Sequence, residues 1–136
     1  MLVISNQLIE RMVDHVEKAY PEEGAGFLLG DDNEVKEILA LSNAREDAAR
    51  RNRYLITPEE YLKAELEAEG LGLSLIGVFH SHPDCPNEPS HYDREWAQPF
   101  FSYIITRVDH GKAVSHRSWK LAEDRSKYDE EEITIQ

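Results

Sequence analysis

The sequence predicts a mixed α/β fold in a single domain, with helices packed on a central sheet. Its 136 residues suit one compact unit, because a domain usually takes about 100 to 200 residues. Segments with apolar residues at helical spacing alternate with short apolar runs of strand length. With 40% apolar residues, 7 glycines and 6 prolines, the chain can bury a core and has neither a disordered nor a fibrous composition.

Three helices are expected, each with a start signal. Ser5 can cap the first, which should end near Tyr20 because Pro21 cannot continue it. Thr57-Pro58-Glu59-Glu60 forms a capping box for the second, which should run to about Glu69 and stop at Gly70. A short third helix is expected from Ser90 to about Ala97.

The remaining apolar runs are expected to be strands. The first two should form a hairpin across the turn 31–33, and the run Leu73–His80 should be a buried central strand. The charged stretch 45–53 is expected to be an exposed connection. The expected strands are 25–30, 35–41, 54–56, 73–80, 102–108, 113–121 and 131–135.

Charge and cysteine content restrict the partners and the compartment. Fifteen Lys and Arg against 27 Asp and Glu give a net charge of −12, which excludes nucleic acid and anionic membrane surfaces as expected partners. No apolar run approaches the roughly 18 residues of a membrane span, and Glu10 interrupts what would be a signal peptide. The single cysteine, Cys85, cannot form an internal disulfide, so we expect a cytoplasmic protein.

The segment His80-Ser81-His82-Pro83 predicts a metal site. Residues two apart in a strand point to the same face, so both imidazoles should project toward one point. The loop from His82 to Asp93 is long enough to turn back and bring the Asp93 carboxylate near them. Two nitrogens and one carboxylate oxygen are typical of a catalytic zinc site, which keeps a fourth position open for water.

Two further residues are candidates for catalysis. Glu23 lies just before the strand 25–30, where its carboxylate can serve as the base that takes a proton from the water. Ser90 is placed to donate a hydroxyl proton to the oxyanion of an attacked carbonyl.

Each of these residues also has a purely structural interpretation. Two histidines in one strand can be core or surface residues, and Ser90 with Asp93 fits a helix capping box. Glu22 and Glu23 can be a solvated acidic turn. Cys85 can be an exposed thiol or a fourth zinc ligand.

The combined pattern resembles the signature of the JAMM (MPN+) zinc metallopeptidase family. The segment H-S-H-P is followed, after six more residues, by Ser90, two residues and Asp93. Upstream, the spacing Pro-x-Glu-x-x-Gly-x-Leu-x-Gly looks like the glutamate motif of that family. This chain matches that motif at Pro21, Glu23, Gly26, Leu28 and Gly30.

The resemblance implies a fold, an activity and residue roles. It implies a single JAMM/MPN (cytidine deaminase-like) domain over 1–136, with its core at about 3–121 and an acidic C-terminal tail, 122–136. It implies one Zn²⁺ per chain, bound by His80, His82 and Asp93, with Glu23 as general base and Ser90 at the oxyanion. The short chain looks like the minimal bacterial branch, whose members hydrolyse the amide bond after the C-terminal Gly-Gly of small ubiquitin-like sulfur carriers.

Two other functions stay open at this stage. A catalytically silent MPN-type scaffold would bind partners without a metal. A structural zinc domain would need a fourth ligand, for which Cys85 and His91 are the close candidates. Trp96, Phe100 and Phe101 can belong to the core or form the face of a homodimer.

Overall fold

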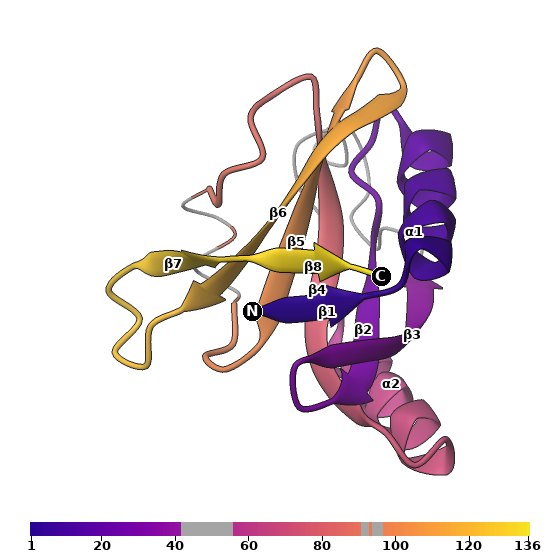
Figure 1. Cartoon of the computed structure of the whole chain (residues 1–136), viewed down its shortest axis with the longest axis vertical. Coiled ribbons are helices and arrows are strands. Elements are labelled where there is room, and N and C mark those ends of the chain that lie inside the picture. The colour runs from indigo at the N-terminus through magenta and orange to yellow at the C-terminus, as the bar shows by residue number, and fades with distance from the viewer. Residues whose placement is uncertain (42–55, 91–92, 94–96) are drawn as a thin grey trace.

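The structure, a computed structural model, describes residues 1–41, 56–90, 93 and 97–136. It confirms the mixed α/β class: two helices flank a central sheet (Figure 1). In chain order the elements are β1 (Leu2–Ile4), α1 (Asn6–Ala19), β2 (Ala25–Asp31), β3 (Glu34–Leu41), α2 (Pro58–Gly70), β4 (Ser74–Pro83), β5 (Ser102–Asp109), β6 (Lys112–Leu121), β7 (Tyr128–Glu131) and β8 (Ile133–Ile135).

The strands of the described residues form one mixed sheet in the order β7-β6-β5-β4-β2-β3-β1-β8. Strand β4 lies in the interior of this sheet, antiparallel to β2 and parallel to β5, so its prediction as a central strand is confirmed. Strands β2 and β3 form the predicted hairpin. Strand β2 pairs with β4 as far as His80, and β5 pairs with it as far as Pro83.

Helix α1 packs on one face of the sheet. The Ser5 hydroxyl accepts the N–H of Leu8 at 3.2 Å, as predicted for the cap, and Tyr20 follows the last helical residue, directly before Pro21. The buried face of α1 packs with Leu28 and Phe79 of the sheet. Its buried residues are Leu8, Ile9, Met12 and Val16.

Helix α2 covers the opposite face. Ala64 and Ala68 are its buried residues, and they pack with Phe27 and Val78, the neighbours in sequence of Leu28 and Phe79. Because successive strand residues point to opposite faces, α1 and α2 lie on different sides of the sheet. Neither helix has the length and apolar character that a bilayer-spanning helix requires.

The ends of α2 confirm one prediction and correct another. The Thr57–Glu60 capping box is present with both of its hydrogen bonds. The helix stops through Gly72 rather than Gly70: Gly70 is its last helical residue, whereas Gly72 has φ +71°. The Leu73 N–H then returns to the Ala68 carbonyl at 2.8 Å, which completes a Schellman-type end.

The C-terminal segment forms two strands where one was predicted at 131–135. Strand β7 pairs with β6, whereas β8 pairs in parallel with β1 at the other end of the sheet. Only Glu132 separates the two strands, and its carbonyl accepts the Leu2 N–H at 2.8 Å. The sheet therefore curls until its two ends meet, in a barrel-like arrangement that includes the acidic tail (Figure 1).

Other expectations fall partly outside the described residues. These include the connection 45–53, most of the strand at 54–56, and Trp96. Of the short helix expected from Ser90, the structure describes Asp93 as helical, and Ala97 lies beyond the helix. Of the two alternatives left open for Phe100, its 72% exposure excludes the core, whereas Phe101 packs partly buried against the α2 side.

Candidate metal centre

The end of β4 places His80 and His82 on the α2 face of the sheet. They follow Val78 at intervals of two residues, so all three side chains share that face. His80 is 1% exposed and His82 6%. A buried imidazole needs a polar partner.

Asp93 lies against both histidines. Its Oδ2 is 3.2 Å from His82 Nε2 and its Oδ1 is 3.4 Å from His80 Nε2. The two histidine Nε2 atoms are themselves 3.2 Å apart. The possible ligand atoms of His80, His82 and Asp93 all lie within 4.8 Å of one another. The structure thus brings together the three residues that the sequence predicts as metal ligands.

The protonation states of His80 and Asp93 suit a cation. Burial lowers the pKa of His80, which favours the neutral imidazole. Burial alone would raise the pKa of Asp93, but the charges and hydrogen bonds of His80 and His82 outweigh it and hold that pKa well below its usual range. A neutral imidazole and an ionised carboxylate are the forms that bind metal.

The ring of His82 is also oriented for this purpose. Its Nδ1 is 2.8 Å from the Pro86 carbonyl, and because a carbonyl can only accept, Nδ1 carries the proton. The Nε2 lone pair is then free to face Asp93 and His80. Burial lowers the pKa of His82, but Asp93 and the Pro86 carbonyl more than compensate and raise it. Two nitrogens and one carboxylate oxygen in a buried cluster fit a zinc ion with an open position.

Glu23 lies two residues before β2, the strand that pairs with β4. Ala25 pairs with His80, and Gly24 exchanges hydrogen bonds with Ser81, so the residues that precede β2 run beside the end of β4. Glu23 is only 4% exposed, which excludes the interpretation of this residue as a solvated acidic turn. A buried carboxylate beside a candidate metal site can serve as a base.

Ser81 is a contributor that the sequence reasoning missed. It is fully buried between the two histidines and points to the opposite face. Its hydroxyl accepts the Gly24 N–H at 2.8 Å, and its own N–H donates to the Gly24 carbonyl at 3.0 Å. Ser81 therefore fixes the residue that follows Glu23. The one sequence signal was a polar residue inside an apolar strand.

Ser90 contacts the cluster through Asp93. Its N–H donates to Asp93 Oδ2 at 2.9 Å, and its hydroxyl accepts the Asp93 N–H at 3.0 Å. These two bonds are those of the predicted capping box, and they also hold the carboxylate toward the histidines. Because Ser90 Oγ accepts in this contact, the contact leaves the hydroxyl proton for another acceptor. Ser90 itself is exposed.

Cys85 does not join the metal ligands among the described residues. Its thiol is free and exposed, as the sequence predicts for a proline-bounded loop. Partial burial of its sulfur and the negative charge of Glu23 raise the pKa of Cys85. His91, the other candidate for a fourth ligand, lies outside the described residues.

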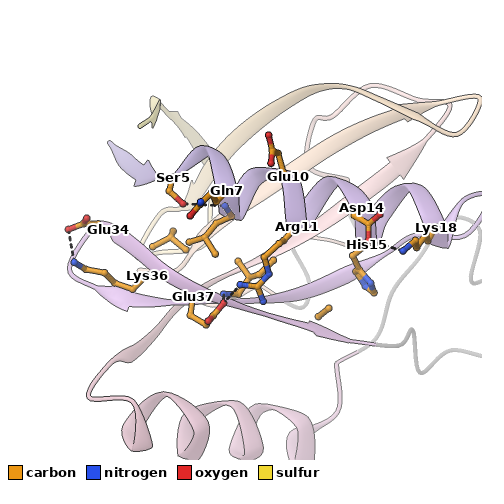
Figure 2. A pocket seen from close by; sticks show the side chains of 14 residues that line it. Ser5, Gln7, Glu10, Arg11, Asp14, His15, Lys18, Glu34, Lys36 and Glu37 are labelled. Atoms are coloured by element: carbon orange, nitrogen blue, oxygen red, sulfur yellow. Dashed lines mark hydrogen bonds and ion pairs between the residues drawn. The ribbon is translucent and has the colours of Figure 1, made fainter.

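A separate groove of about 1060 Å³ lies between α1 and β3 (Figure 2). Its charged side chains form ion pairs with one another, such as Lys18 with Asp14 at 2.9 Å and Arg11 with Glu37. The metal-ligand cluster is not among the residues that line it. The groove is therefore distinct from the candidate metal centre.

Comparison with known proteins places this site in a family. The model of the prokaryotic homologs of the JAB domain matches residues 5–122. The chain belongs to this family. The match spans α1, the turn that carries Glu23, the three candidate metal ligands and the strands from β2 to β6.

Two relatives of this JAB domain have names that state an activity. One is the desampylase of Pyrococcus furiosus, which is 34% identical over 116 residues, 84% of this chain and 76% of that protein. The other is named a probable TtuB-protein conjugate cleaving protease, from Thermus thermophilus. It is 33% identical over 109 residues, 80% of this chain and 72% of that protein.

Solved structures agree with the assignment of the JAB domain. Protein DSY2949 from Desulfitobacterium hafniense has a TM-score of 0.86 at 30% identity, over 100% of this chain and 93% of that one. A JAB1/MPN domain protein from Archaeoglobus fulgidus has a TM-score of 0.62 at 20% identity, over 99% and 98% of the two chains, and this likeness concerns the fold. The predicted JAMM/MPN fold is confirmed.

Proposed function

We propose that this JAB domain is a zinc-dependent metallopeptidase or isopeptidase. Its substrate is a small ubiquitin-like or sulfur-carrier protein, and it hydrolyses the amide bond after the C-terminal Gly-Gly. The observation that carries the proposal is the buried cluster of His80, His82 and Asp93, with the buried Glu23 two residues before Ala25, the β2 partner of His80. The free thiol of Cys85 is consistent with a cytoplasmic location.

The residues divide the chemistry between them. A zinc ion held by His80, His82 and Asp93 would act as a Lewis acid toward water and the amide carbonyl. Glu23 takes a proton from the attacking water and returns it to the amine as the C–N bond breaks. Ser90 donates its hydroxyl proton to the oxyanion that develops on the carbonyl.

The substrate class is supported by the relatives and by the shape of a glycine tail. The two relatives carry names that refer to desampylation and to TtuB conjugates. An extended Gly-Gly tail has no side chains, so it can pair with strand backbone close to a buried site. Selection among substrates then depends on contacts with the folded body of the carrier.

The test is cleavage of a ubiquitin-like carrier that bears a short extension after its Gly-Gly, followed by mass spectrometry. Wild-type protein is compared with Glu23→Gln and with Glu22→Gln, a matched change at the adjacent, half-buried carboxylate. We expect one bound zinc in all three proteins. Cleavage should fall about 10² to 10⁴-fold in Glu23→Gln and stay unchanged in Glu22→Gln.

Two results would contradict the proposal. Wild-type protein without zinc after dialysis would eliminate the metal mechanism. Zinc bound but no cleavage of the extended carriers would favour the alternative, a catalytically silent scaffold that binds partners.

A further inference from the structure

The loop that follows the metal-binding strand is docked onto the sheet through Asn87. This residue is 5% exposed although it lies in the stiff segment between Pro86 and Pro89. Its Nδ2 donates to the Ile105 carbonyl at 3.3 Å and to the Ser115 hydroxyl at 3.0 Å. The amide thus joins the loop to both β5 and β6.

The backbone of Asn87 is held from the same side. The Trp119 indole N–H donates to the Asn87 carbonyl at 3.2 Å. The Arg117 guanidinium lies 4.5 Å from the centre of the Trp119 ring and also contacts Glu88, at 3.3 Å. Ser115, Arg117 and Trp119 alternate along β6, so one face of that strand binds the loop.

This anchor is one residue from the group that orients His82. The Pro86 carbonyl, which accepts the His82 Nδ1 proton, belongs to the peptide unit that ends at the Asn87 nitrogen. Ile105, which accepts the Asn87 amide, is in turn the ladder partner of His80. Asn87 is therefore tied to both histidine positions, on one side through the loop and on the other through β5.

We propose that Asn87 is a positioning residue of the metal centre, which holds the Pro86 carbonyl where it fixes the ring of His82. This inference rests on the proposed metal site. Partners that orient a metal-binding histidine typically change metal affinity 10- to 100-fold when they are lost. Because Asn87 acts through the Pro86 carbonyl, we expect the lower end of that range.

The test compares zinc affinities by competition with a chromophoric chelator, at a temperature where every variant is folded. Asn87→Ala removes the anchor, and Asn87→Asp keeps its size but removes both Nδ2 protons. The control is Ser118→Ala, which removes the 2.7 Å hydrogen bond from the hydroxyl of the buried Ser118 to Glu131. Ser118 is on the same strand, β6, but its side chain lies away from the loop. Melting temperatures of the metal-free proteins are measured in parallel.

We expect the zinc Kd to rise about tenfold in both Asn87 variants. In Ser118→Ala the melting temperature should fall while the Kd stays within twofold of wild type. If Asn87→Ala does not fold, Ser115→Ala removes one of its two acceptors and should raise the Kd in the same direction. A Kd within twofold of wild type in the folded Asn87 variants would overturn the inference, as would an equal rise in Ser118→Ala. Wild-type protein without zinc would instead refute the proposed function.

Discussion

Ser81→Ala is the sharpest test of how the base is held at the candidate site. The substitution keeps the β4 backbone and removes one oxygen, the acceptor of the Gly24 N–H. The backbone bond from the Ser81 N–H to the Gly24 carbonyl remains. The turn that carries Glu23 therefore stays attached to β4 by one bond instead of two.

The structure gives the size of the expected effect. The lost bond is 2.8 Å long and joins two buried residues, so its removal leaves a buried N–H without this acceptor. That costs about 1–3 kcal/mol of the free energy of unfolding. A catalytic group displaced by about 1 Å can also cost about 10²-fold in rate. We therefore expect a loss of stability together with a loss of carrier cleavage of up to about 10²-fold.

Urea denaturation measures the first effect, and cleavage of the extended carrier by the folded protein measures the second. Ser118→Ala is the matched control, because it also loses a buried serine bond but lies on β6, away from Glu23. It should lose stability and keep its cleavage rate. If Ser81→Ala cleaves as fast as wild type, Ser81 does not position Glu23 and the reasoning is refuted.

Three further predictions concern the metal, the packing beside it and pH. Zinc at 100 times its Kd should stabilise the protein by about 2.7 kcal/mol, which raises Tm by roughly 10 °C, and the chelator EDTA should remove this gain. An unchanged Tm would contradict the three-ligand site. Gly26→Ala should lower the free energy of unfolding measured with urea by about 1–3 kcal/mol, because the added Cβ would lie 2.3 Å from the buried Phe79 ring. In the control Gly70→Ala the added Cβ meets no atom within 4 Å, so this variant should not be destabilised. Burial lowers the pKa of His116, so as the pH falls the unfolded chain binds a proton at this residue before the folded protein does. The free energy of unfolding should therefore fall as the pH drops below about 6.5, and it should fall less steeply in His116→Gln. An equal slope of stability against pH in the variant would exclude this contribution.

Local patterns in the sequence predict most of the fold. Caps at Ser5 and Thr57 fix where the helices begin, and the apolar runs fix the strands because each lies within one contiguous segment. The division of 131–135 between two ends of the sheet could not be predicted in this way. It depends on pairing with β1 and β6, whose positions in space no local pattern contains.

In the candidate site, too, local sequence patterns predict some of the contacts, whereas others depend on the assembled sheet. His80 and His82 share a face by strand geometry, and the loop length allows Asp93 to return to them. The partners of Ser81 and Asn87 are distant in sequence, 57 positions away for Gly24 and 18 for Ile105. Which strand each side chain meets follows only from the assembled sheet.

The pairing of β1 with β8 has a consequence for biosynthesis. The first strand of the sheet in chain order pairs with the last, so β1 has no β8 partner until Ile135 has been synthesised. Until then the nascent chain also lacks β7 along β6, and unpaired strand edges are where chains associate wrongly. We therefore expect the sheet of this domain to close only after β8 has been synthesised.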